Sequence, residues 1–352
     1  MSDLSAAAVP DPIASAAPEA DAPVAPHAHA AVCLIVNPSA GGGRAGRAAG
    51  DVVRALVAAG LEVRSEHTRD LEHARELATT AARAGEHAVT LGGDGLAGAV
   101  ADALRHVPGA VLGVLPGGRG NDLARVLGIP LDPIEACAVI AHGTPRPMDL
   151  GEIGGRAFVG IASLGFDSDA NRIANEAPSW LGGLVYAYGA LRAMWSWKPA
   201  RFHVELAPSG ECLDFTGYSV ATANSRAFGG GMFLAPDAAL DDGMLDIVAI
   251  EGTAKVRYLA DLPKVFKGTH VKVPNVHVLR AAEVEISAER PFTIYADGDP
   301  IAELPARVRT LRHALEVLVP DDSLLASAHS ERPAPPEHGP GARADDPLAE
   351  RQ

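Results

Sequence analysis

Three short glycine-rich stretches, each following an apolar run, contain the residues best suited to phosphate chemistry. They span residues 37–44 (NPSAGGGR), 91–96 (LGGDGL) and 115–122 (LPGGRGND). Glycine lets backbone N–H groups approach an anion closely, and the first turn of a following helix adds a favourable dipole. The first stretch matches neither the P-loop pattern GxxxxGK[ST] nor the dinucleotide pattern GxGxxG. Taken alone, the first stretch is equally explained as an ordinary tight turn between a strand and a helix.

Two charged side chains stand out within these stretches. Asp94 follows two glycines after a buried strand, where it could orient a metal–phosphate group or a substrate hydroxyl; it could also be the N-cap of the next helix, and the two roles are compatible. Arg119 lies among glycines, and a guanidinium presented in this way suits phosphate recognition. The alternative for Arg119 is a salt bridge to Asp122 or another acid. Either Asn121 or Asp122 is expected to cap the helix that follows.

Alternating strands and helices position these stretches. The expected strands are residues 31–36, 61–64, 88–91 and 111–115, and the expected helices are residues 44–59, 71–84 and 96–106. Continuous apolar strands separated by helices indicate a parallel, doubly wound sheet covered on both faces. Ligand sites in such sheets lie at the carboxyl ends of the strands. Three of the four strands run directly into the glycine-rich stretches.

The second half of the chain has a different pattern. Short alternating runs at residues 202–206, 218–223, 245–250, 276–279, 284–286 and 292–295 indicate an antiparallel β-sandwich. Two helical pieces are expected at residues 167–175 and 181–197. The second piece is the most hydrophobic in the chain, but its glycines and Arg192 argue against membrane insertion. A packed helix is favoured, and contact with a membrane interface through Trp195 and Trp197 is left open.

The chain is therefore divided into a disordered tail at residues 1–29, an α/β domain at 30–145, a β-sandwich domain at 146–320 and a second disordered tail at 321–352. Both tails lack apolar periodicity. They also hold much of the negative charge, since each contributes −4 to the total of −14 and the central 291 residues contribute the remaining −6.

Composition limits the possible functions. No basic patch appears, so a duplex nucleic acid partner is disfavoured. The three cysteines, Cys33, Cys137 and Cys212, have no metal-ligand or disulfide spacing. The N-terminal residues resemble no signal peptide, and a cytoplasmic protein is expected.

Taken together, these motifs resemble the diacylglycerol kinase catalytic-domain family of soluble lipid kinases, which includes the sphingosine and ceramide kinases. The matching segments are residues 37–41, 92–95, 115–122, 181–186 (LGGLVY), 235–246 (APDAALDDGMLD) and 297–299 (DGD). One such segment is weak, but these occur in order and at matching spacing across residues 31–320.

The resemblance implies an ATP-dependent, Mg²⁺-dependent kinase that phosphorylates diacylglycerol or a related lipid alcohol. Asp297 would accept the proton of the lipid hydroxyl, and Asp94 would help to position that group and Mg²⁺. The residues implied to contact ATP are Asn37, Pro38, Ser39, Ala40, Gly41, Thr68, Gly92, Gly93, Asp94, Gly95, Gly118, Arg119, Asn121 and Asp122.

The family also implies a structural Mg²⁺ held by Asp242 and the backbone oxygens of Ala239 and Met244; a plain hairpin turn with Asp-Gly at its tip is an equal alternative. The protein is expected to contact the inner membrane surface transiently, and a homodimer is left open.

Three departures from the family pattern keep alternatives open. Leu96 and Arg119 each replace a threonine that would contact phosphate, although sphingosine kinases also carry leucine at the first position, and Asp299 replaces a glutamate. A kinase for a soluble substrate, as in the NAD kinases that share the GGDG turn, is a second hypothesis. A non-catalytic relative that binds nucleotide or lipid is a third, but retention of Asp94, Asp122 and Asp297 favours activity.

Overall fold

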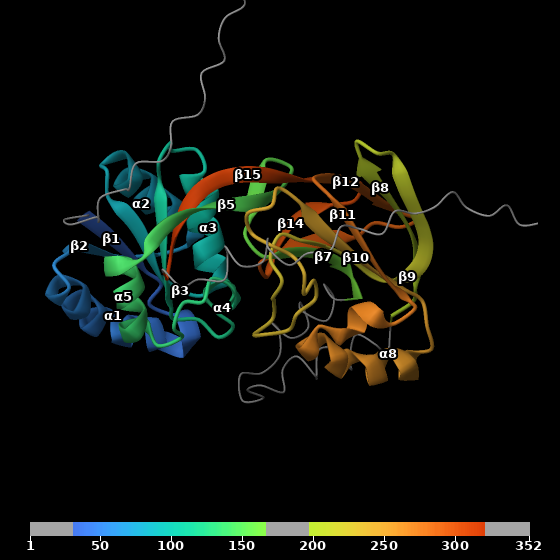
Figure 1. Ribbon diagram of the computed structural model, residues 1–352, viewed down its shortest axis with the longest axis horizontal. Coiled ribbons are helices and arrows are strands. Elements are labelled where there is room, and N and C mark those ends of the chain that lie inside the picture. Colours follow the sequence, from blue (N-terminus) through green and yellow to red (C-terminus); the bar gives the residue numbers. More distant parts are fainter. Residues whose placement is uncertain (1–30, 167–196, 321–352) are drawn as a thin grey trace, which may run out of the picture.

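The computed structural model describes residues 31–166 and 197–320, which form an α/β domain and a β-sandwich joined by long strands (Figure 1). The first domain contains β1 (Ala31–Val36), α1 (Ala40–Ala58), β2 (Glu62–His67), α2 (Leu71–Arg83), β3 (His87–Gly92), α3 (Asp94–Leu104), β4 (Val111–Pro116), α4 (Asp122–Val126) and α5 (Pro133–His142). The expected fold class is confirmed.

The strand order of the first sheet, β2-β1-β3-β4, determines where a ligand would lie. All of these pairings are parallel. The chain reverses its direction of winding between β1 and β3, so α1 and α5 pack together on one face while α2 and α3 pack together on the other. The carboxyl ends of β1 and β3 therefore form a topological switch point, which is the usual ligand site of such folds.

The edge strand β2 differs from the expected apolar strand. It runs further along the chain, to His67, and every residue in it is partly or fully exposed. By contrast, β1 and β3 are almost entirely buried. Because β2 has a neighbour on one side only, it tolerates the polar residues that the central strands exclude.

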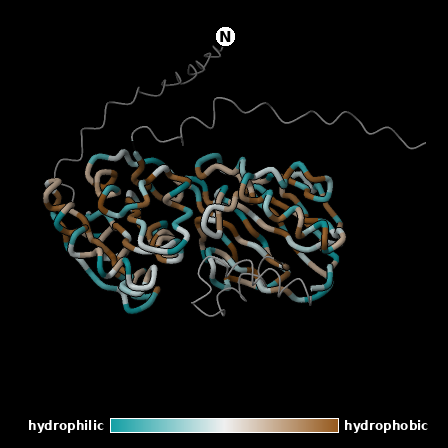
Figure 2. The backbone as a smooth tube through the Cα atoms, turned by 90° about the horizontal axis from the view of Figure 1, so that it is seen from below, coloured by the Kyte–Doolittle hydropathy of each residue, from teal (hydrophilic) through white to brown (hydrophobic). Residues whose placement is uncertain are grey.

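The second domain is antiparallel. Its elements are β5 (Thr144–Ile153), β6 (Arg156–Phe158), β7 (Ile161–Gly165), β8 (Ala200–Ala207), β9 (Glu211–Ala223), β10 (Leu245–Glu251), α8 (Lys255–Asp261), the 3₁₀-helices η2 (Leu262–Lys267) and η3 (Thr269–Lys272), β11 (Val276–Ala281), β12 (Glu283–Ala288), β13 (Thr293–Ala296), β14 (Asp299–Glu303) and β15 (Ala306–Val319). Figure 2 shows that hydrophobic segments run through the interior of both domains.

The last strand, β15, belongs to both domains. It pairs antiparallel with β12 and β5, and its final residues pair parallel with β4, where Glu316 is opposite Val111. Leu315, Val317 and Val319 are buried in the hydrophobic core of the first domain. Figure 1 shows β15 and β5 running side by side from one domain to the other. The first sheet is therefore completed by residues that follow the sandwich in the sequence.

Some expectations fall on residues outside the described ranges. These are the two tails, the helix at 167–175 and all of the piece at 181–197 except Trp197. Trp197 itself is only 5 % exposed and packs edge-to-face against Phe166, with ring centroids 6.0 Å apart. This burial agrees with packing of Trp197 inside the protein, and it argues against the membrane-interface contact that the sequence left open for this residue. Among the described residues, no helix has the length and apolar character needed to cross a bilayer.

Candidate active site

The three glycine-rich stretches converge at the carboxyl edge of the first sheet. The N–H of Gly117 donates to the carbonyl oxygen of Gly92 at 2.6 Å, which joins the third loop to the second. A Cβ added at Gly41 would collide with the carbonyl oxygen of Gly117, and one added at Gly118 would collide with the α-carbon of Gly93. Glycine is therefore required where these backbones touch.

The predicted nucleotide-binding residues of the first loop lie at this edge. Gly41 and its two successors have positive φ angles of 60°, 69° and 83°, which a side chain would disfavour. Asn37 fixes the start of the loop, because its Oδ1 accepts hydrogen bonds from the N–H of Ser39 at 3.1 Å and from its Oγ at 2.9 Å. Pro38 and Ala40 flank Ser39 in the same turn. This tight turn places the start of α1 beside the other two loops.

Thr68 and the rest of the second loop share the same edge. Thr68 directly follows β2, and its N–H donates to the carbonyl oxygen of Val36 at 2.8 Å. Gly92, Gly93 and Gly95 lie between β3 and the first turn of α3. The structure therefore brings the predicted nucleotide residues of all four strand ends to one side of the sheet.

Leu96 takes no part in this polar edge. It is 2 % exposed and packs against Gly92 within the core of the first domain. A leucine at this position fills space beneath the loop, and it presents no hydrogen-bonding group to a nucleotide.

In the third loop, neither Asn121 nor Asp122 caps the following helix as expected. Asn121 occupies the N-cap position of α4 in a left-handed conformation (φ 53°), but its side chain makes no capping bond. Its Oδ1 accepts from the N–H of Gly118 at 2.8 Å, and its Nδ2 donates to the carbonyl oxygen of Gly118 at 3.2 Å. Arg44 also donates to that carbonyl. The Asn121 amide therefore closes the loop on itself, because the left-handed backbone turns it away from the helix.

The carboxylate of Asp122 forms two hydrogen bonds between the domains. Its two oxygens accept hydrogen bonds from the N–H groups of Gly230, at 2.8 Å, and Gly231, at 2.7 Å. Both glycines have positive φ and belong to the second domain. Burial raises the pKa of Asp122, and the negative charge of Asp94 adds to this effect, while the two N–H donors oppose it. Both oxygens of this predicted nucleotide ligand already have protein partners.

Asp94 is the first residue of α3, and Gly93 is the N-cap, so Asp94 does not cap its own helix. One carboxylate oxygen accepts from the N–H of Leu123 at 3.0 Å, which links α3 to α4. Among the described residues, no lysine or arginine forms an ion pair with Asp94. Its negative charge therefore remains available to a cation at the loop edge.

Asp297 reaches this edge from the second domain. It lies in the turn between β13 and β14 with a positive φ of 51°. Its two carboxylate oxygens accept hydrogen bonds from the N–H groups of Val159, at 2.8 Å, and Gly160, at 2.9 Å. The positive φ of Asp297 directs its side chain toward α3, and these two hydrogen bonds fix the orientation of the carboxylate.

Two glycines make room for the Asp297 carboxylate. A Cβ added at Gly98 of α3 would lie 2.9 Å from its Oδ2, and one added at Gly160 would lie 2.5 Å from its Oδ1. Neither glycine has a positive φ, so the need for glycine comes from the approach of the carboxylate. Sequence reasoning missed both residues. The signal for Gly98 was its position four residues after Asp94, on the same face of the helix.

Burial raises the pKa of Asp297 to about 7. The negative charges of Asp94 and Asp299 also raise it, and the hydrogen bonds from Val159 and Gly160 lower it. The carboxyl group is enclosed, although the residue as a whole is only partly buried. A carboxylate with a pKa near neutrality is well matched to proton transfer at cellular pH.

The donor set at this edge fits Mg²⁺. Asp94, Asp297 and Asp299 lie close enough for Asp94 and Asp299 to raise the pKa of Asp297. None of the three has an ion-pair partner among the described residues. Hard cations bind carboxylate oxygens, and such a cation would offset the mutual repulsion of these aspartates.

Arg119 is exposed on the third loop. Its side chain forms no hydrogen bond or ion pair within residues 31–166 and 197–320. The alternative of a salt bridge to Asp122 is therefore wrong for this structure, since the Asp122 oxygens bond to Gly230 and Gly231.

At the second predicted Mg²⁺ site, Asp242 pairs with the guanidinium of Arg280 and accepts from the N–H of Met244 at 3.0 Å. The N–H of the neighbouring Gly243 donates to the buried carboxyl group of Asp149 at 2.6 Å. This hydrogen bond holds the turn that follows Ala239. A cation there would share the Asp242 carboxylate with Arg280. The metal role of Asp242, Ala239 and Met244 stays a prediction.

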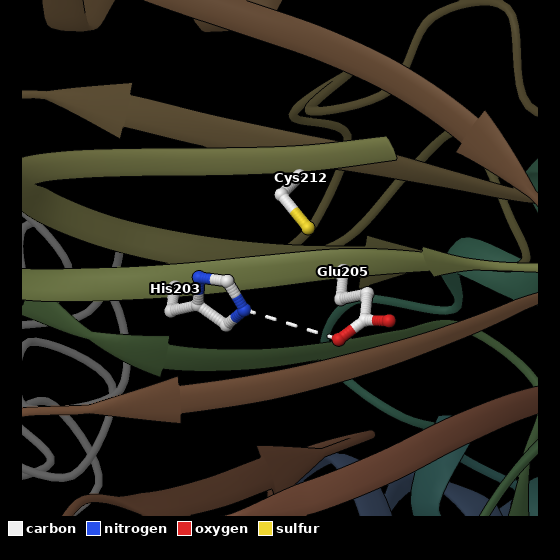
Figure 3. A group of neighbouring side chains, drawn as sticks. All are labelled: His203, Glu205 and Cys212. Carbon is white, nitrogen blue, oxygen red and sulfur yellow. Dashed lines mark ion pairs between the residues drawn. The ribbon is translucent and has the colours of Figure 1, made fainter. Parts of the chain in front are cut away.

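Another group of ionisable side chains lies on β8 and β9 (Figure 3). His203 and Glu205 extend from β8, with Cys212 on the adjacent strand, and their polar atoms lie within 4.8 Å of one another. His203 Nδ1 is also 3.0 Å from Asp214. Thiol and imidazole are not the ligands that Mg²⁺ prefers, so this group is distinct from the predicted magnesium sites.

Comparison with known proteins agrees with this architecture. Residues 31–153 match the family model "Diacylglycerol kinase catalytic domain", and residues 160–319 match "YegS C-terminal NAD kinase beta sandwich-like domain". A protein of Mycobacterium tuberculosis named "Diacylglycerol kinase" is 33 % identical over 82 % of this chain and 95 % of its own length. A "Probable lipid kinase YegS-like" of Chromohalobacter salexigens is 30 % identical over 71 % of this chain and 82 % of its own length.

A solved structure has the same fold. The crystal structure of a putative diacylglycerol kinase from Bacillus anthracis superposes with a TM-score of 0.73 at 22 % identity, covering 86 % of this chain and 99 % of that one. The family matches, the extent of the relatives and this fold lead to one conclusion: the chain belongs to the diacylglycerol kinase catalytic-domain family of lipid kinases.

Proposed function

We propose that this protein transfers the γ-phosphoryl group of ATP to the hydroxyl of diacylglycerol or a closely related lipid alcohol, in a Mg²⁺-dependent reaction. The observation that carries the proposal is the position of Asp297. Its carboxylate is oriented by two backbone N–H groups, has a pKa raised to about 7, and meets α3 beside the glycine loops. An acid at a domain junction with these properties is suited to serve as a general base.

The phosphates of ATP would lie along the loop edge. Backbone N–H groups of the glycine loops, the first regular helical turn of α1 after Gly43 and the N-terminal turn of α3 offer partial positive charge there. Arg119, exposed on the third loop, would add a charge-assisted contact with a phosphate oxygen. Since phosphoryl transfer requires mainly alignment and charge neutralisation, a site made largely of backbone is sufficient.

The transfer would proceed with Asp297 as base. The O–H bond of the lipid alcohol breaks as its proton passes to the Asp297 carboxylate, and the hydroxyl oxygen forms a bond to the γ-phosphorus. The bond between that phosphorus and the β–γ bridging oxygen breaks, so that ADP leaves. Asp94 and Asp299 would hold Mg²⁺, which neutralises phosphate charge when bound.

The proposal is tested by incubating the full chain with γ-³²P-labelled ATP, Mg²⁺ and one acceptor at a time, followed by thin-layer separation. The acceptors are diacylglycerol, sphingosine and ceramide in detergent micelles, and NAD in solution. We expect labelled phosphatidic acid from wild type and none from folded Asp297→Asn protein, because an amide cannot accept the proton.

Labelled product from NAD alone would support the soluble-substrate alternative. Absence of product from every acceptor, with ATP binding retained, would support a non-catalytic relative. Wild-type turnover by Asp297→Asn would remove Asp297 from the mechanism.

A further inference from the structure

The lysines of this chain are concentrated in one short segment. Of its five lysines, four lie within residues 255–272, which form α8, η2 and η3, hereafter the α8–η3 segment. With Arg257 and a single acid, Asp261, the formal charge of the segment is +5 − 1 = +4, in a chain whose net charge is −14. The negative total concealed this local excess, and the expectation that no basic patch appears is wrong here.

The basic side chains of the segment point outward. All five cationic residues are exposed. Asp261 pairs with Lys264 at 2.7 Å and with Arg257 at 3.9 Å. Lys267 and Lys272 form no ion pair within the described part of the chain. The positive charge on this face is therefore only partly neutralised by the protein.

Two large apolar side chains are exposed among these cations. Val256 is 81 % exposed between Lys255 and Arg257, and Phe266 is 56 % exposed next to Lys267. Val256 is the most exposed of the large hydrophobic residues that the structure describes. Exposed apolar groups within a basic surface are typical of proteins that insert side chains below charged headgroups.

The opposite face of the segment is anchored to the sandwich. Tyr258 is 7 % exposed, and its ring centroid lies 4.5 Å from that of Tyr218. His270 is buried, with Nε2 3.0 Å from the carbonyl oxygen of Leu234, and the N–H of Phe233 donates to the carbonyl oxygen of Val265 at 2.9 Å. The segment is thus held on one side while Val256, Phe266 and the lysines face outward.

We propose that the outer face of the α8–η3 segment is the surface with which this protein docks on anionic phospholipid membranes. The positive charge of the segment attracts anionic headgroups, and insertion of Val256 and Phe266 into the apolar part of the bilayer adds an attraction that a soluble polyanion cannot offer. In Figure 1, α8 lies on the same lower side of the molecule as α1 and α4, which follow the first and third glycine loops. The inference rests on the proposed function in one respect: a lipid substrate resides in that membrane.

The test is co-sedimentation of the full chain with vesicles of phosphatidylcholine alone or with 30 % phosphatidylglycerol. We expect binding only to the anionic vesicles. The pair Lys267→Glu and Lys272→Glu should raise the lipid concentration for half-binding at least tenfold, and Phe266→Ser should weaken binding without changing its salt dependence. The matched control reverses the charge of two exposed arginines in the first domain, Arg54→Glu and Arg83→Glu. This variant should bind vesicles like wild type.

Equal binding by the Lys267/Lys272 variant and wild type, or failure of wild type to bind anionic vesicles, would overturn the inference. The inference would also be overturned if wild type bound soluble heparin as tightly as anionic vesicles and Phe266→Ser left vesicle binding unchanged. The site would then recognise any polyanion. Phosphorylation of diacylglycerol in detergent micelles is measured in parallel. If wild type binds vesicles but does not phosphorylate diacylglycerol, the proposed function alone is refuted. If wild type is active but substitutions in the α8–η3 segment leave vesicle binding unchanged, this inference alone is refuted.

Discussion

The carboxylate of Asp122 in the first domain accepts a 2.8 Å hydrogen bond from the backbone N–H of Gly230 in the second, across 108 positions of sequence. A second bond, from Gly231, occupies its other oxygen. An aspartate within a motif that resembles a nucleotide-binding loop therefore connects the two halves of the candidate site. This geometry favours a role for Asp122 in linking the domains over direct contact with a nucleotide, which the motif alone does not distinguish.

We predict that Asp122→Ala lowers the free energy of unfolding by about 2 kcal/mol, because it leaves two N–H groups without their acceptor. Urea denaturation measures the loss, and hydrogen exchange at residues 229–231 should become faster. The control is Asp132→Ala, which removes an exposed N-cap bonded to Ile134 and Glu135 and should cost about 1 kcal/mol without affecting that exchange. An unchanged stability with a raised KM for ATP would instead indicate direct nucleotide contact.

The raised pKa of Asp297 predicts the pH dependence of catalysis. A base acts when deprotonated, so kcat/KM should be low below pH 7, rise through about pH 7 and level off above it. In the metal-free protein, Asp299→Asn removes one of the negative charges that raise this pKa, so a carbon NMR titration of the Asp297 carboxyl group should give a midpoint at lower pH than in wild type. The same midpoint in both proteins would contradict this coupling between the two carboxylates.

Gly98→Ala should impair the chemical step. The new methyl group would lie 2.9 Å from Oδ2 of Asp297 and would displace the carboxylate, and a displacement of 1 Å can cost about a hundredfold in rate. We expect kcat to fall by about that factor while KM for ATP changes little. The control is Gly50→Ala on the exposed face of α1, which should stabilise the protein by up to about 1 kcal/mol and leave kcat unchanged. A fully active Gly98→Ala protein would contradict the proposed placement of the base.

Arg119→Ala should raise KM for ATP about tenfold, the effect of losing one charge-assisted contact of roughly 1.4 kcal/mol. Its melting temperature should not change, because Arg119 has no partner among the described residues that the substitution would leave unpaired. Arg119→Thr, which restores the hydroxyl usual in the family, should recover part of the affinity. Arg83→Ala, at the end of α2 on the opposite edge of the sheet, is the charge-matched control. An unchanged KM in Arg119→Ala would refute the phosphate role.

The architecture was predictable because apolar periodicity is a local property. The strand Ala31–Val36 was predicted to the residue, since five of its six residues are buried and its sequence is continuously apolar. The full extent of β2 was not predicted, because an edge strand carries polar residues and its sequence therefore resembles that of a loop. The entry of β15 into the first sheet could not be inferred, since it pairs residues 316 and 111, far apart in the sequence.

The site was predictable only in part. Asp94 could be identified from its place in a glycine-rich stretch, and Asp297 from the resemblance of its motif to the lipid kinase family. Their hydrogen-bond partners could not be identified from the sequence. The N–H groups of Val159 and Gly160 that orient Asp297 belong to backbone, which every residue possesses, so no residue type marks them. The role of Asp122 depends on a contact between domains, and a local capping rule gave the wrong partner.

The course of β15 has a consequence for synthesis on the ribosome. The first domain begins at β1, yet its sheet lacks the neighbour of β4 until residues 316 and 317 have been translated. A nascent chain that ends after α5 would leave the edge of β4 without a partner, open to pairing with another chain. The first domain thus reaches its final form only after the sandwich has emerged, so the two domains mature together.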